Sequence, residues 1–97
     1  MSERGEGRTT AQMLAAPHGA IYIWPVHSSL SYAKSLAQHI GRVDLAIAPI
    51  GWLSSISNTR GCRSPVVIDH GTLGRIRPGS EEHAGIEALR HRGRLAP

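Results

Sequence analysis

Three short apolar runs, each with glycine or proline close to its ends, recur along the chain between more polar segments. They cover Ala20–Trp24, Val43–Ile50 and Pro65–Asp69. Runs of this length that are rich in β-branched or aromatic residues are typical of buried strands. We therefore predict three short strands.

Between the first two runs, apolar residues recur at the spacing of one helix face, at Leu30, Ala33, Leu36, Ala37 and Ile40. Ser28 or Ser29 is a suitable N-cap for this helix, and Gly41 is a natural C-terminal stop. A strand, a helix and a second strand in this order form the βαβ unit, whose strands are parallel and whose crossover is right-handed. We therefore predict an α/β fold: a small Rossmann-like unit of two or three layers, with about three short parallel strands and two main helices.

The second main helix is expected after Ser80, which can act as its N-cap. Glu81 and Glu82 stand at the positive end of this helix, and Arg90 and Arg92 stand at its negative end. Gly93 then ends it. The arginines at its end therefore need no ligand to explain them, although they also suit a bound anion.

The remaining segments carry weaker patterns. Met1–Arg8 mixes glycine with alternating charges, so we expect a disordered N-terminal arm followed by a single α/β domain over residues 9–97. Thr9 or Thr10 can cap a short helix that ends near Ala16, before Pro17. Trp52–Arg63 is rich in serine, glycine and asparagine and is predicted to be a loop, with room for one helical turn at Trp52–Ile56.

Composition indicates the size of the core, the cellular compartment and the partners to expect. Only 40% of the 97 residues are apolar and phenylalanine is absent, so the predicted core is thin, and pairing with a second copy of the chain or with another protein, such as a host protein, is expected. Cys62 is the only cysteine, which suits a reducing compartment. No apolar run is long enough to span a membrane, and Glu3 and Glu6 interrupt the region of a signal peptide. We expect a cytoplasmic protein without a membrane partner.

Charge points to a polyanionic partner. The formal net charge is +4, and arginine outnumbers lysine ten to one among the basic residues, although a GC-rich genome would also favour arginine. The last quarter of the chain holds the candidate nucleic-acid-binding residues: Arg75, Arg77, Arg90, Arg92 and Arg94.

Polar residues that follow the predicted strands form a second candidate site. In open parallel sheets, ligands bind beyond the carboxyl ends of the strands. That rule assigns ligand binding to residues of three loops: His27, Ser28, Ser29, Trp52, Asp69, His70 and Thr72. The alternative is structural: the serines cap the helix, Trp52 fills the core, and Asp69 accepts hydrogen bonds from a neighbouring loop.

The motifs of common enzymes are missing. Neither GxxxxGK[ST] nor GxGxxG occurs, so we expect no nucleotide cofactor, and no histidine lies at HExxH or HxH spacing, so we expect no metal site. A hydrolase built from His27, Asp69 and a serine remains an alternative, but the GxSxG elbow is absent. Cys62, between two arginines, is either reactive or an ordinary loop thiol. We assign no catalytic residue.

The stretch Gly19–Thr72, with AIYIWP, SLSYAKSLAQHIGR, DLAIAPIGWL and VVIDHGT, resembles small uncharacterised Rossmann-like α/β proteins of bacteriophages and bacteria. It is also similar to a fragment of a RecA-like helicase core without the nucleotide loop. The resemblance implies a small phage-encoded protein, located in the cytoplasm of a bacterial host, without motor activity. No site residue follows from it.

The leading functional hypothesis is a non-enzymatic binding or regulatory module that contacts nucleic acid or a nucleotide. It would use the crevice beyond the strands together with the arginine-rich tail. The alternative is a protein-interaction module, such as a phage-encoded inhibitor of a host protein or a homodimeric accessory factor.

Overall fold

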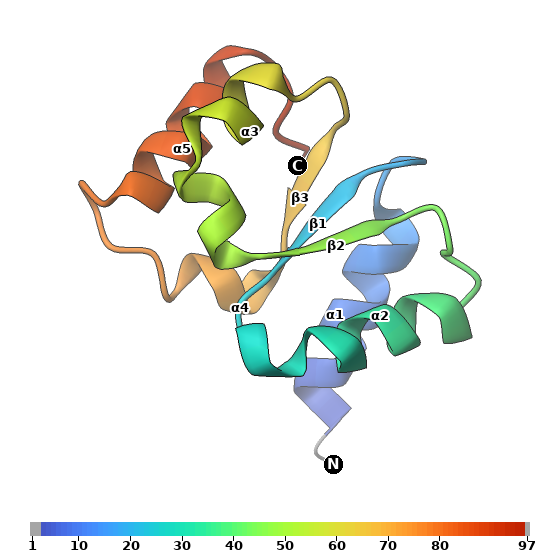
Figure 1. The fold of residues 1–97 in the computed structure, drawn as a ribbon. Helices are drawn as coiled ribbons and strands as arrows, with labels where there is room; N and C mark the ends of the chain where they lie inside the picture. Colours follow the sequence, from blue (N-terminus) through green and yellow to red (C-terminus); the bar gives the residue numbers. More distant parts are fainter. Residues whose placement is uncertain (1–2, 97) are drawn as a thin grey trace.

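The computed structural model describes the backbone of residues 3–96, and the side chains of residues 8–26 and 28–96. Its sheet contains β1 (Ile21–Trp24), β2 (Ala46–Pro49) and β3 (Val66–Ile68), which are parallel and lie in the order β2-β1-β3 (Figure 1). The register places Tyr22 beside Ile47 on one side and beside Val67 on the other. The predicted α/β class with three parallel strands is confirmed.

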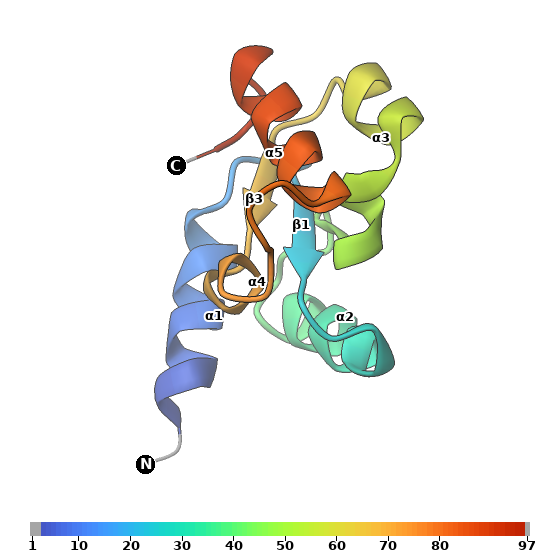
Figure 2. The same ribbon diagram turned by 90° about the vertical axis from the view of Figure 1, so that its left-hand side faces the viewer.

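Helices cover both faces of this sheet (Figures 1 and 2). One face carries α1 (Glu3–Ala15) and α2 (Leu30–His39), which pack on the core around Tyr22 and Met13. The other face carries the 3₁₀ turn η2 (Ile50–Ser54), α3 (Ile56–Gly61) and α5 (Glu81–His91), which pack on the core around Ile23. Successive strand residues point to opposite faces, so each short strand contributes to both cores. The result is a three-layer arrangement.

Two short elements follow the strands at their carboxyl ends. The 3₁₀ turn η1 (His27–Ser29) leads from β1 into α2, and α4 (His70–Leu73) follows β3 directly. Among residues 3–96, no helix has the length and apolar character needed to cross a membrane.

The structure corrects three predicted boundaries. The first helix begins at Glu3, not at Thr9 or Thr10, so residues 3–8 of the expected disordered arm continue α1; Met1 and Ser2 lie outside the described residues. The physical reason is that α1 is anchored further along, where Met13 is fully buried, and its backbone hydrogen bonding continues toward the N-terminus. The second strand begins only at Ala46, because Arg42–Leu45 form a turn in which the Leu45 N–H donates to the Arg42 carbonyl.

The third correction concerns Trp52–Arg63, which the sequence predicts to be a loop with room for one helical turn at Trp52–Ile56. It holds the end of η2 and the helix α3, whose N-cap Ser55 accepts a hydrogen bond from the Asn58 N–H at 3.4 Å. The sequence pattern is too polar for this helix to be recognised, because its stability depends on packing against α5.

Gly85 sets the distance between α5 and η2. A Cβ atom at this position would lie 1.9 Å from the carbonyl oxygen of Leu53, so no other residue fits without displacing backbone. α5 itself starts as predicted, with the Ser80 hydroxyl accepting a hydrogen bond from the His83 N–H at 3.2 Å. The close approach of Gly85 to the Leu53 carbonyl fixes the C-terminal helix α5 on its face of the sheet.

Ser29 occupies the N-cap position of α2, as one of the two predicted alternatives, but its side chain does not cap the helix. Its Oγ accepts a hydrogen bond from the Trp24 indole at 2.9 Å and donates to the Val26 carbonyl at 3.3 Å. The serine therefore fixes the turn between β1 and α2 and holds Trp24 in place.

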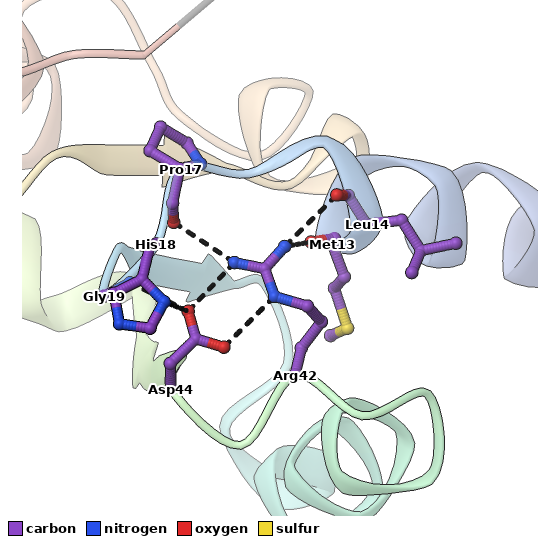
Figure 3. A network of polar contacts seen from close by, with 7 residues as sticks. All are labelled: Met13, Leu14, Pro17, His18, Gly19, Arg42 and Asp44. Atoms are coloured by element: carbon purple, nitrogen blue, oxygen red, sulfur yellow. Dashed lines mark hydrogen bonds and ion pairs between the residues drawn. The ribbon is translucent and has the colours of Figure 1, made fainter.

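Arg42 ties α1 to the turn before β2 (Figure 3). Its guanidinium donates to carbonyl groups at the end of α1, including Leu14 at 3.2 Å, and makes two hydrogen bonds to Asp44, at 3.1 and 2.9 Å. Asp44 also accepts a hydrogen bond from the Gly19 N–H at 2.8 Å. The Arg42 guanidinium, and to a smaller extent the Gly19 N–H, hold the pKa of Asp44 below its usual range. Arg42 and Asp44 are therefore both charged over the physiological pH range.

Candidate functional site

The carboxyl end of the sheet is closed around Asp69, which is only 2% exposed. Its carboxylate accepts hydrogen bonds from the Tyr22 hydroxyl, from Thr9 Oγ1 at 3.1 Å and from the Gly71 N–H at 3.0 Å. Burial, reinforced by the hydrogen bond to Asp69, raises the pKa of Tyr22 above its usual range and keeps this hydroxyl a donor. Asp69 is therefore saturated by the protein itself.

Residues next to Asp69 are also used internally. The His70 N–H donates to the Gln12 side-chain carbonyl at 2.7 Å, and the His70 ring nitrogen Nε2 lies 3.3 Å from Thr9 Oγ1. Thr72 is fully buried and donates to the Ile23 carbonyl at 3.1 Å. Helix α1 thus covers the end of β3 where the sequence predicted a ligand.

The other predicted crevice residues are scattered. Ser28 is exposed, Ser29 is bonded to the Trp24 indole, and Trp52 packs against the core around Ile23. The side chain of His27 lies outside the described residues, so the predicted proximity of His27 and Asp69 stays a prediction. For Trp52 and Asp69, the structure favours the alternative interpretation, in which both are structural. Ser29 and Asp69 have separate hydrogen-bond partners, and the hydrolase alternative, which also needs His27, stays a prediction.

The arginine-rich tail lies at the opposite end of the sheet. Figures 1 and 2 show α5 ending above the amino end of β3, while α4 lies below its carboxyl end. The Arg94 carbonyl accepts a hydrogen bond from the Val66 N–H at 2.8 Å, at the start of β3. The crevice and the tail, which the leading hypothesis uses together, therefore lie at opposite ends of the sheet.

At this amino end, the fold brings together two basic segments that are distant in the sequence. Helix α3 packs against α5, and both helices end at the same side of the molecule (Figures 1 and 2). We call these two segments the amino-end basic surface; its arginines are Arg60, Arg63, Arg90, Arg92 and Arg94, and Arg60 also lines a pocket with Glu81 of α5. No acidic residue occurs in segments 55–64 or 88–96. The first two arginines were not recognised as site residues in the sequence.

Most of these arginines extend into solvent. Arg60, Arg63, Arg90 and Arg92 are exposed, and among the described side chains only Arg90 has an acidic partner, Glu87, at 2.6 Å. Arg94 is half-buried, and its Nε atom is buried without a hydrogen-bond partner among the residues described. These exposed arginines differ in their partners from Arg42, whose guanidinium donates hydrogen bonds to protein groups.

Arg75 and Arg77 do not belong to this surface. They are exposed in the connection between α4 and α5, which starts from the carboxyl end of the sheet. The five arginines predicted as one nucleic-acid-binding set are thus divided between two ends of the molecule.

Cys62 is buried at 6% exposure, and its Sγ atom donates to the Ser64 carbonyl at 3.1 Å. It packs in the core around Ile23, as a small apolar residue would. No group of three or more metal-ligating side chains occurs in the part of the chain that the structure describes.

Comparison of the chain with protein-family models, with curated proteins and with solved structures found no match. The resemblance to small phage proteins therefore stays a prediction.

Proposed function

We propose that this protein is a non-enzymatic module that binds the phosphate backbone of nucleic acid through the amino-end basic surface. The observation that supports this most is that α3 packs against α5, so that the segment with Arg60 and Arg63 and the segment with Arg90 and Arg92 both end toward the amino end of the sheet. Guanidinium groups bind phosphates through forked, charge-assisted hydrogen bonds. A set of five arginines with one acidic partner suits a repeating polyanion better than a single small anion.

Charges at helix ends explain only part of this surface. Arg90 and Arg92 stabilise α5 by facing the negative end of its dipole, and no ligand is needed for that. Arg60 likewise stands in the last turn of α3, whereas Arg63 follows the C-cap Cys62 in an irregular segment. Like charges gathered on one surface repel each other, so the arrangement costs stability unless a polyanion neutralises it.

The proposal is tested by fluorescence anisotropy with a short labelled DNA duplex and a matching RNA strand at two salt concentrations. We expect binding that weakens steeply with salt. The double variant Arg60→Ala/Arg63→Ala should weaken binding about tenfold and should lower the slope of log K against log salt by about one unit per lost phosphate contact.

The matched control is Arg75→Ala/Arg77→Ala, which removes the same charge from exposed positions at the other end of the sheet. It should change affinity by no more than about twofold, through the general field of the protein. Equal effects of the two double variants, or no binding at low salt, would contradict the proposal.

A second candidate function, protein interaction, is favoured by a separate observation: among residues 3–96, no segment pairs with the outer edge of β2.

A further inference from the structure

The two edges of the sheet differ in whether their outward-facing backbone groups are paired. At the outer edge of β3, the chain's own tail adds a short extended segment: the Val66 N–H donates to the Arg94 carbonyl, and the Ala96 N–H donates to the Val66 carbonyl, both at 2.8 Å. Leu95 forms a parallel bridge with Val66. The protein itself thus pairs an extended segment with this edge.

Gln12 completes the same edge from helix α1. Its side-chain amide donates to the Ile68 carbonyl at 3.1 Å and accepts from the His70 N–H at 2.7 Å. An amide side chain here replaces the peptide group of a neighbouring strand. Of the outward-facing backbone groups of β3, the N–H and carbonyl of Val66 and the carbonyl of Ile68 are therefore occupied.

The outer edge of β2 has no such cover among residues 3–96, since β2 is the last strand of the order β2-β1-β3. On its inner side, the Ala46 N–H donates to the carbonyl of Ala20, the residue directly before β1, at 3.0 Å. Because parallel ladders alternate, Ala46 and Ala48 face β1, while the N–H and carbonyl of Ile47 face outward. Pro49 has no N–H and ends the edge, so the pairing sequence is short.

A groove lies along this edge, between β2 and α2. It has a volume of about 320 Å³ and is lined by Lys34, Ala37 and Gln38 of α2, and by Leu45, Ala46 and Ile47 of β2 and its approach. Val43, with 76% of its surface exposed, stands at the same groove. An edge strand with free backbone groups, beside a helix and a groove lined by both apolar and polar side chains, is the arrangement that peptides use when they add a strand to a sheet.

We propose that the β2 edge and this groove bind an extended peptide segment of another protein, with apolar side chains directed into the groove and an acidic residue paired with Lys34. The charge of the groove selects this partner. Of the two basic residues that line it, Arg42 is already occupied by Asp44, which leaves the Lys34 ammonium for the ligand. A second copy of this chain is a poorer occupant, because its net charge is also +4.

This site is independent of the amino-end basic surface, so either proposal can fail without the other. The probe is a displayed library of random heptapeptides, selected against the full chain and, in parallel, against Lys34→Glu. We expect the full chain to enrich sequences that alternate apolar and polar residues, include Asp or Glu and lack proline.

An enriched peptide is then synthesised and its affinity measured by titration. Lys34→Glu should weaken binding about tenfold, because it replaces an attraction by a repulsion. The matched control Arg77→Glu makes the same charge change at an exposed position outside the groove and should alter affinity by no more than about twofold. Equal effects of the two variants would overturn the assignment of Lys34.

Amide hydrogen exchange provides the structural readout. Binding of the peptide should slow exchange at Ile47, whose N–H gains a carbonyl partner, and should leave Ala46, already bonded to β1, unchanged. The proposal is overturned if no peptide is enriched over the Lys34→Glu selection or if bound peptide leaves Ile47 exchange unaltered. It is also overturned if sedimentation shows that the chain dimerises and protects Ile47 without peptide, since a second copy would then be the occupant.

Discussion

The two ends of the parallel sheet use their polar residues in opposite ways. At the carboxyl end, Asp69 and Thr72 are buried, and protein groups fill their hydrogen-bonding capacity. At the amino end, Arg60, Arg63 and Arg92 extend into solvent without an ionic partner among the described residues. A polar group that the fold has already satisfied has little left to offer a ligand, whereas an exposed cation still has all its donors.

The closed carboxyl end of this sheet also marks a limit of the rule that ligands bind beyond the carboxyl ends of parallel strands. That rule holds where loops leave a crevice open. Here α1 packs across the end of β3, and Thr9 and Gln12 take the positions that a ligand would use. The functional surface is then expected at the other end.

The largest effect is expected from Gly85→Ala, which would damage the amino end. The new methyl group would meet the Leu53 carbonyl and force α5 away from η2, at a cost of about 3 kcal/mol in the free energy of unfolding. Urea denaturation measures this loss. The control Gly61→Ala, with no atom near its added Cβ, should change stability by less than about 1 kcal/mol. Equal behaviour of the two variants would show that α5 does not pack as described.

A smaller effect is expected from Asp69→Asn, which alters the carboxyl end. The amide can still accept from Tyr22 or Thr9, but it places an NH₂ group near a donor and loses the charge, so we expect a loss of about 2 kcal/mol. Thermal denaturation gives the stability, and anisotropy gives the DNA affinity. Unchanged stability together with weakened DNA binding would restore Asp69 as a ligand-binding residue.

The smallest effect concerns Asp44, and it depends on pH. Because the folded pKa of Asp44 is lowered by Arg42, its carboxylate stabilises the fold above the unfolded pKa of about 4, and this contribution is lost as pH falls toward the folded value. The stability difference between the natural chain and Asp44→Asn should therefore be largest at neutral pH and should shrink below pH about 4. A difference that grows in acid would contradict the ion pair.

The sequence predicts the elements whose signals are local. The apolar runs around Tyr22, Ile47 and Val67 mark the strands, and the spacing of Leu30 to Ile40 marks α2. Helix α3 is missed because Ser57 and Asn58 have low helix propensity, and its packing on α5 at Gly85 stabilises it. The strand after Arg42 is predicted too long, since no local pattern indicates that Arg42 reaches back to α1.

The candidate sites depend even more on long-range contacts. Asp69 is closed by Thr9 and Tyr22, which lie 60 and 47 residues away along the chain. Likewise, the segment with Arg60 and Arg63 comes near α5 only because α3 packs on that helix. One local signal was present: the segment 55–64 holds two arginines and no acidic residue. Its position before a parallel strand already places it at the amino end of the sheet.

The most direct test of the central claim is a chemical-shift map of the isotope-labelled protein during titration with a short DNA duplex at low salt. We expect the amide signals of residues 60–64 and 90–94, at the ends of α3 and α5, to shift when DNA binds, and those of residues 69–77 to stay in place. Shifts confined to residues 69–77, or no shifts at all, would contradict this expectation.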